Sequence, residues 1–232
     1  MIPLEIKMKN DLTIIMLTAS RVPAKWVQFH KKKLIEAAGT SPIITISREP
    51  LDWGTNLLDT EKYGISNIYF QLLRGTKKAK TEFVAVAEDD TLYPKEHFEY
   101  RPPSDTFAYN KNRLGLFRWG KPTYFWKDRI SNSTLIAPRK LAIEALEERF
   151  AKYPDGTPSY YTGELGRPNI EDKLKVSHRK STWFTTELSV VRVDHELGID
   201  RLSRTHRKAM GILRSYDIPH WGKAEDIVKK FV

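Results

Sequence analysis

Three consecutive carboxylates, Glu88, Asp89 and Asp90, follow an apolar run in the segment VAVAEDDTLYP at residues 84–94. Hard divalent cations such as Mn²⁺ and Mg²⁺ prefer carboxylate oxygens, and Mg²⁺ is usually held by one or two carboxylates while substrate phosphates complete its shell. An acidic group at the end of a buried strand therefore fits a site for a metal-bound diphosphate. A solvated acidic turn is the competing interpretation.

The elements around this acidic run indicate how it is positioned. Apolar runs typical of buried strands are LTIIMLT (12–18), PIITIS (42–47) and EFVAVAE (82–88). Apolar residues at helical spacing predict one helix from about Trp26 to Gly39 and another over 65–80. This alternation predicts an open α/β sheet flanked by helices.

Polar residues follow each of the three strands. They are Thr18, Ala19, Ser20 and Arg21 after the first, Ser47 and Arg48 after the second, and the acidic run after the third. In open α/β sheets, ligands bind beyond the carboxyl ends of the strands. This coincidence favours a binding site over an ordinary acidic turn.

The second half of the chain is less regular. Short strands are predicted at 107–110, 114–119, 133–138 and 188–193, and helices at 139–153 and about 223–231. A polar loop with glycine and proline occupies 154–169 and is long enough to suggest a functional loop. The last predicted strand ends in Asp194-His195, so it too ends in residues that could take part in chemistry.

Composition limits the class of protein. The chain has 232 residues, 40% of them hydrophobic and 11% aromatic, which predicts one globular domain over 1–232. No apolar run approaches the roughly 20 residues of a membrane span, and the N-terminus lacks a signal-peptide pattern. With no cysteine, disulfides and thiolate metal sites are excluded, and we expect a cytoplasmic protein that does not bind membranes.

Basic residues are in excess and occur in clusters. Lys and Arg total 39 against 29 acids, a net charge of +10. The clusters are at 21–33, 74–80, 173–180 and 201–214. Such a surface attracts a polyanion or the phosphates of a nucleotide, although each cluster is also compatible with a solvated helix face.

The order of these motifs resembles the glycosyltransferases of the GT-A fold, particularly small bacterial and phage members. The matching segments are LTIIMLTASRVP, NIYFQLLRGTKKAKTEFVAVAEDDTLYPKEHF, FAYN, ALEERF, VRVDHELGI and THRK. The resemblance implies a Rossmann-like open mixed sheet flanked by helices. It also implies a nucleotide-sugar half at about 10–100 and an acceptor half at about 101–215.

The resemblance also implies roles for the acidic run, which matches the family's DXD motif. Asp90 corresponds to the ligand of Mn²⁺ or Mg²⁺, with Glu88 and Asp89 contacting the donor or assisting. His195 matches a late histidine that completes the coordination, and imidazole is a reasonable manganese ligand. An ordinary histidine at a strand end is the alternative for His195.

Further positions are implied for the donor. Thr18, Ala19, Ser20 and Arg21 resemble the loop that cradles the base and ribose, and Arg21 has the planar fork that pairs with phosphate. Arg207 and Lys208 match a basic pair over the diphosphate. A metal with Arg or Lys would stabilise the charge that develops on the departing nucleotide diphosphate.

A catalytic base is sought among the acids of the polar loop. Glu164, Glu171 and Asp172 are available, and the resemblance favours Glu164 because an acidic residue precedes a Gly-Arg pair there. Such a base removes the acceptor proton in an inverting enzyme, whereas in a retaining enzyme Glu164 would position the acceptor.

Other residues have mainly structural interpretations. His97 in KEHF is expected to pack beside Phe98. The aromatic residues Trp119, Tyr124, Phe125 and Trp126 suggest either a wall against which the acceptor stacks or ordinary core packing.

The leading hypothesis is a metal-dependent transfer of a sugar, with a UDP-sugar as the default donor, to a hydroxyl. A hydroxymethylated pyrimidine in phage DNA, modified in the host cytoplasm, is the favoured acceptor. A polysaccharide or lipid-linked acceptor, a nucleotidyltransferase and a non-catalytic nucleic-acid-binding protein are the alternatives. A nucleotidyltransferase is disfavoured because no glycine-rich phosphate loop follows the first strand. For a transferase, Asp90→Ala is expected to abolish turnover with little loss of folding.

Overall fold

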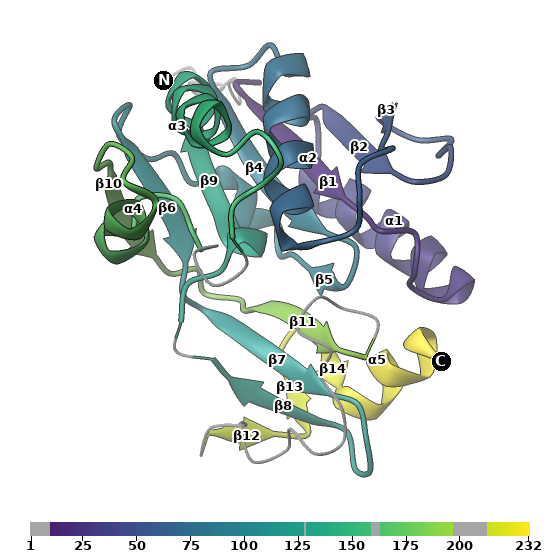
Figure 1. Cartoon of the computed structure of the whole chain (residues 1–232). Coiled ribbons are helices and arrows are strands. Elements are labelled where there is room, and N and C mark those ends of the chain that lie inside the picture. The colour runs from purple at the N-terminus through teal and green to yellow at the C-terminus, as the bar shows by residue number, and fades with distance from the viewer. Residues whose placement is uncertain (1–9, 128, 159–162, 197–212) are drawn as a thin grey trace, which may run out of the picture.

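The computed structural model describes residues 10–127, 129–158, 163–196 and 213–232, and its framework is two β-sheets that meet at an angle (Figure 1). The larger sheet has seven strands in the order β10-β6-β9-β4-β1-β2-β3. Its strands are β1 (Leu12–Leu17), β2 (Ile43–Ser47), β3 (Thr55–Leu58), β4 (Phe83–Glu88), β6 (Thr106–Asn110), β9 (Leu135–Pro138) and β10 (Lys180–Phe184).

The larger sheet is mixed. Strand β1 pairs in parallel with both β2 and β4, whereas β9 is antiparallel to β4 and β6. Its helices are α1 (Ala24–Ala38), α2 (Ile65–Lys78), α3 (Arg139–Lys152) and α4 (Pro168–Leu174). The predicted fold class, an open mixed α/β sheet flanked by helices, is therefore confirmed.

Both faces of the larger sheet are covered, which explains the continuous apolar runs in its strands. Ile15 and Leu17 of β1 pack with α2 and α3, while Ile14 and Met16 pack on the opposite face, against the α1 side. Helix α2 lies close to β1 because Gly75 has no side chain: a Cβ there would meet the Cγ2 of Ile15 at 2.5 Å.

The smaller sheet has five strands in the order β12-β8-β7-β11-β5. They are β5 (Thr91–Leu92), β7 (Arg113–Phe117), β8 (Thr123–Trp126), β11 (Val190–Asp194) and β12 (Arg214–Ser215), and a separate hairpin joins β13 (Asp217–Ile218) to β14 (Gly222–Lys223). Helix α5 (Ala224–Phe231) packs with α1 against this sheet, where Trp26 and Phe231 meet edge to face at 4.9 Å. None of the helices in the described ranges has both the length and the apolar character that crossing a bilayer requires.

The structure differs from the sequence prediction in the second half. The strand predicted at 114–119 is β7, which ends at Phe117, and the chain then turns at Gly120, whose φ of 67° favours glycine, before β8 begins. Strands β3, β5, β8, β10, β12, β13 and β14 were not predicted; most of them are short or lie at sheet edges with polar residues. Helix α4 begins inside the predicted loop.

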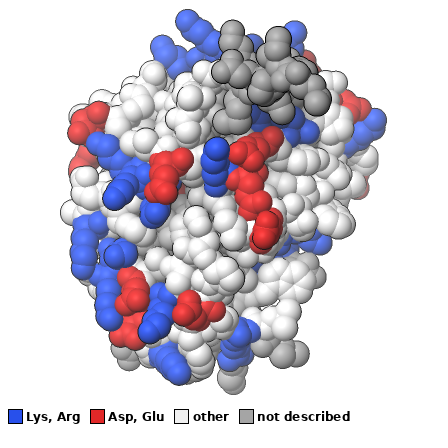
Figure 2. Space-filling view, turned by 180° about the vertical axis from the view of Figure 1, so that it is seen from behind, with Lys and Arg blue, Asp and Glu red and all other residues white. Residues whose placement is uncertain are grey.

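Surface charge is mixed on the face opposite to that of Figure 1. Figure 2 shows Lys and Arg side chains interspersed with Asp and Glu there, with no continuous basic patch. Elsewhere on the molecule, basic side chains also form ion pairs, among them Lys77 of α2 with Glu147 of α3. The positive charge on this face therefore does not by itself define a polyanion-binding surface.

His97 is buried in an aromatic cluster, as predicted for a packing role beside Phe98. Its ring meets Phe98 edge to face at 4.9 Å and stacks near Phe184 at 5.9 Å. The side chain of Asn110 approaches Nδ1 at 3.3 Å, while Nε2 is buried without a partner. Burial lowers the pKa of His97 from 6.5 to about 3, so the ring is neutral in the folded protein.

This burial predicts acid-dependent stability. Because the pKa of His97 is lower in the folded than in the unfolded chain, its contribution is complete above about pH 6.5 and is lost as the pH falls towards 3. We expect His97→Phe to reduce the fall in the free energy of unfolding by up to about 1.4 kcal/mol per pH unit in that range, measured by urea denaturation. The exposed His178 supplies the control His178→Gln, and equal pH slopes for wild type and His97→Phe would contradict the prediction.

Candidate functional site

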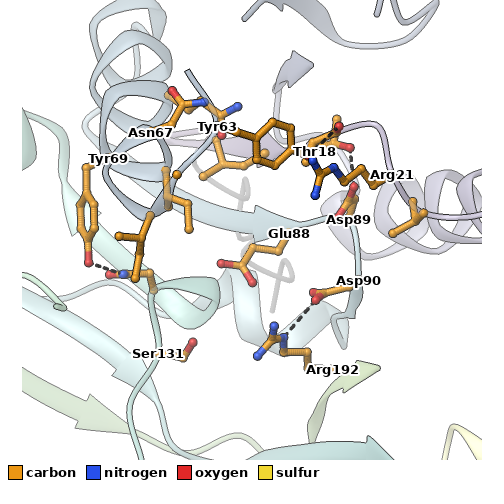
Figure 3. Close-up of a pocket in the computed structure, with 18 of the residues that line it drawn as sticks. Thr18, Arg21, Tyr63, Asn67, Tyr69, Glu88, Asp89, Asp90, Ser131 and Arg192 are labelled. Atoms are coloured by element: carbon orange, nitrogen blue, oxygen red, sulfur yellow. Dashed lines mark hydrogen bonds and ion pairs between the residues drawn. The ribbon is translucent and has the colours of Figure 1, made fainter. Parts of the chain in front are cut away.

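A cavity of about 270 Å³ opens at the carboxyl ends of β1 and β4 (Figure 3). Because these strands are parallel neighbours, the loop after β1 and the acidic run after β4 lie side by side. Helix α2, residues 129–132, residues 163–164 and the end of β11 supply the remaining walls. The cavity therefore lies between the two sheets.

The structure brings most of the predicted site residues to this cavity. Those that line it are Thr18, Ala19, Arg21, Glu88, Asp89, Asp90, Glu164 and His195. Ser20 is not in the lining; its φ is 55°, and its backbone N–H donates to the Thr18 hydroxyl at 2.9 Å. Arg207 and Lys208 lie outside the described residues.

Asp89 joins the acidic run to the first-strand loop. The Thr18 hydroxyl donates to its carboxylate, and the Trp26 Nε1–H donates to its backbone carbonyl at 2.6 Å. Burial and the neighbouring charge of Asp90 raise the pKa of Asp89 to about 7. Asp89 therefore gives up its proton far less readily than an exposed aspartate.

Asp90 is the best-paired carboxylate of the run. Thr91 Oγ1 donates to its Oδ1 at 2.7 Å, Arg192 Nε donates to its Oδ2 at 3.0 Å, and His195 Nε2 lies 3.3 Å from the same Oδ2. Burial alone would raise the pKa of Asp90, but the charge of Arg192 and the hydrogen bond from His195 hold it well below its usual range. Asp90 is therefore ionised.

Glu88 ends β4 and faces into the cavity (Figure 3). Its backbone N–H donates to the Tyr93 hydroxyl at 2.9 Å, and that hydroxyl donates to the Ser133 carbonyl at 2.8 Å. Burial and the charge of Asp90 raise the pKa of Glu88 to about 7, with Arg192 acting in the opposite direction. Near neutral pH the run therefore carries less than its full formal charge.

The surroundings of Asp90 and His195 do not fit a resident metal ion. A carboxylate accepts only, so His195 Nε2 faces Asp90 as an N–H donor rather than with a lone pair. Its Nδ1 is buried and has no hydrogen-bond partner among the described residues, whereas a ligating histidine usually donates its other N–H to an acceptor. Within the described ranges, no three His, Asp or Glu side chains are grouped to hold a metal ion.

Arginines are the main site residues that the sequence interpretation missed. Arg192 and Arg129 also line the cavity. Arg21, which was predicted, lies over the Tyr63 ring at 3.6 Å from its centroid, and Arg48 lies at 4.6 Å from it. A signal for Arg192 exists in the sequence, since it is the one charged residue within the apolar run VVRV.

The polar loop contributes Glu164, whose side chain is 19% exposed and whose Oε2 accepts from Arg167 Nη1 at 3.0 Å. Glu171 has a different role. It is buried and accepts hydrogen bonds from the backbone N–H groups of Gly166 and Arg179, so it braces the loop. Of these acids, only Glu164 reaches the cavity.

The aromatic residues of β8 and the preceding turn do not form a wall of the cavity. Tyr124 and Phe125 are buried on opposite faces of the smaller sheet, in separate clusters, whereas Trp126 is 40% exposed. Trp119 meets Phe117 edge to face at 5.0 Å. Packing, the alternative interpretation, is therefore the structural role of Trp119, Tyr124 and Phe125.

No protein-family model matches the sequence, and no curated protein matches it significantly. Among solved structures, a nucleotidyl transferase from Methanothermobacter thermautotroptrophicus has a TM-score of 0.43 and 13% identity, over 77% of this chain and 88% of that one. A glycosyltransferase involved in glycosylation of the major capsid of PBCV-1 has a TM-score of 0.46 and 10% sequence identity, over 78% of this chain and 91% of that one. A mannosyltransferase from Pyrobaculum calidifontis was solved with GDP-Man and Mn²⁺. It has a TM-score of 0.43 and 13% sequence identity, over 79% of this chain and 56% of that one. Similarity at this level assigns no activity to this chain.

The burial of Asp90 changes the expectation for its removal. Asp90→Ala would leave the buried Arg192 guanidinium without its carboxylate, so we expect the free energy of unfolding to fall by about 3 kcal/mol. This replaces the expectation of little loss of folding. Urea denaturation measures the change, with the exposed Asp52→Ala as control. Equal stability of Asp90→Ala and wild type would show that the pair does not form in solution.

Proposed function

We propose that this chain is a glycosyltransferase that moves a sugar from a nucleoside diphosphate to an acceptor hydroxyl, with a UDP-sugar as the default donor. The observation that carries the proposal is the cavity itself. Three carboxylates at the end of β4 face arginines from the loop after β1 and from β11, and Glu164 stands at its rim. Such a site suits a ligand with phosphate charges and hydroxyl groups.

The donor is proposed to bind along the carboxyl ends of β1 and β4. The base and ribose lie by the loop of Thr18, Ala19, Ser20 and Arg21, beside the Tyr63 ring. The diphosphate lies near Arg192, with Glu88 and Asp89 placed to accept hydrogen bonds from ribose or sugar hydroxyls. Arg207 and Lys208 remain proposed diphosphate contacts on the strength of the family resemblance.

The chemical step needs a base and a stabilised leaving group. In the proposed inverting reaction, Glu164 takes the acceptor proton and the acceptor oxygen bonds to the anomeric carbon. The bond from that carbon to the diphosphate oxygen breaks, and the diphosphate leaves with the electron pair. Positive charge fixed near the diphosphate lowers the barrier because it is already in place when the negative charge develops.

The acceptor is proposed to be a hydroxymethylated pyrimidine in DNA, which an enzyme would have to reach in a groove or flip out of the stack. The net charge of +10 supports a polyanionic acceptor. We put this acceptor on the side of the cavity, because the charge on the face in Figure 2 is mixed. A polysaccharide or lipid-linked acceptor is the alternative.

A donor panel tests the proposed function. Purified protein is incubated with UDP-, GDP-, ADP- and dTDP-sugars, with and without Mn²⁺, and release of the nucleoside diphosphate is measured in the presence of each acceptor class. We expect release with a UDP-sugar, stimulated by hydroxymethylated DNA. Release that is indifferent to DNA would remove the acceptor proposal only. Pyrophosphate release from a nucleoside triphosphate and a sugar phosphate would instead indicate a nucleotidyltransferase.

The role of Glu164 has its own test. Glu164→Gln keeps the shape of the side chain but removes the base, so we expect kcat to fall by about 100-fold or more with little change in thermal stability. The matched control is Glu147→Gln, since Glu147 is half exposed on α3 and pairs with Lys77 outside the cavity. A Glu164→Gln enzyme with wild-type kcat would exclude Glu164 as the base.

A further inference from the structure

The position of Arg192 is fixed by the backbone. In β11 the neighbouring Val191 and Val193 are buried in the core of the smaller sheet, so Arg192 points to the opposite face, towards the cavity. The backbone N–H of Val193 donates to the carbonyl of Asp90 at 2.9 Å, and Arg192 is in register with Thr91 of β5. The pairing of β11 with the segment of Asp90 and Thr91 therefore holds the guanidinium beside the acidic run.

Other basic side chains lie near Arg192. Lys127 Nζ pairs with Asp194 Oδ1 at 2.8 Å, and both side chains are nearly buried. Burial lowers the pKa of the Arg113 guanidinium to about 10, and repulsion from Arg192 and Arg129 adds to this. These cations therefore lie close enough to interact, and the charges of Arg192 and Arg113 oppose those of the acidic run at Glu88.

We propose that Arg192, seated on Asp90, supplies the positive charge that binds and stabilises the leaving diphosphate, so that sugar transfer by this chain does not require a divalent cation. The inference rests on the proposed function. It follows from the geometry at Asp90, where a metal bound to Oδ2 would have to displace the contacts that Arg192 and His195 make with this oxygen. Displacement would leave a buried guanidinium without its carboxylate, beside further cations.

The wild-type protein gives the first test. UDP binding is measured by calorimetry in the presence of a chelator and again with Mn²⁺, and Mn²⁺ binding is followed by electron paramagnetic resonance with and without UDP. We expect UDP to bind equally well in both conditions, no stoichiometric Mn²⁺, and turnover that survives the chelator. UDP binding and turnover that appear only with Mn²⁺ would overturn the inference and restore Asp90 and His195 as metal ligands.

Variants give the second test. Arg192→Gln is expected to weaken UDP binding by about tenfold in chelator and to lower turnover by about 100-fold. The control is Arg179→Gln, because Arg179 pairs with Glu148 at 2.7 Å outside this cavity. With Asp90 freed, Mn²⁺ should recover part of the lost UDP affinity in Arg192→Gln and have no effect on wild type. Wild-type UDP affinity in Arg192→Gln would overturn the inference.

The two proposals fail differently. UDP binding that depends on Arg192, without sugar transfer from any donor, would overturn the proposed function and sustain the assignment of Arg192 as the diphosphate cation. Sugar transfer that requires a divalent cation would sustain the proposed function and overturn the assignment of Arg192 as the diphosphate cation. If Arg192→Gln does not fold, as judged by circular dichroism, Arg192→Lys retains the charge, and the wild-type measurements with chelator decide the question alone.

Discussion

The ion pair between Asp90 and Arg192 is the contact on which the site depends. Asp90 lies two residues beyond Glu88, the last residue of β4 in the larger sheet, and Arg192 belongs to β11 in the smaller one. A buried carboxylate is tolerated only when its lone pairs are filled by donors. The cavity between the sheets therefore exists only where both sheets are in place, and the same contact serves packing and chemistry.

The pKa values of Glu88, Asp89 and Asp90 differ because their neighbouring groups differ, not because of residue type. Asp90 faces a guanidinium, an imidazole and a hydroxyl, so it stays ionised in spite of its burial. Asp89 is held by the neutral hydroxyl of Thr18, and Glu88 has the charge of Asp90 beside it; both have a raised pKa. A run that is uniform in sequence thus contains one fixed anion and two groups that can hold a proton.

Local patterns predicted the first half of the fold well, because strands covered on both faces read as continuous apolar runs. The acidic run and Arg21 could be placed at one cavity because the parallel strands β1 and β4 bring their carboxyl ends together, whereas Glu164 and His195 were placed there by the family resemblance alone. The partner of Asp90 could not be predicted, since Arg192 lies 102 positions away and its register depends on the pairing of β11 with β5.

An acidic triplet at a strand end does not by itself distinguish a metal site from a cation-paired one, because both need buried carboxylates beside a phosphate site. The difference lies in what fills the lone pairs. On Asp90, Oδ1 accepts from Thr91, while Oδ2 accepts from Arg192 and faces His195, so a metal on Oδ2 would have to replace a cation that is already there. An arginine fixed in a strand also cannot leave with the diphosphate as a bound metal can. The side chains around the motif, more than the motif, therefore determine which chemistry this cavity supports.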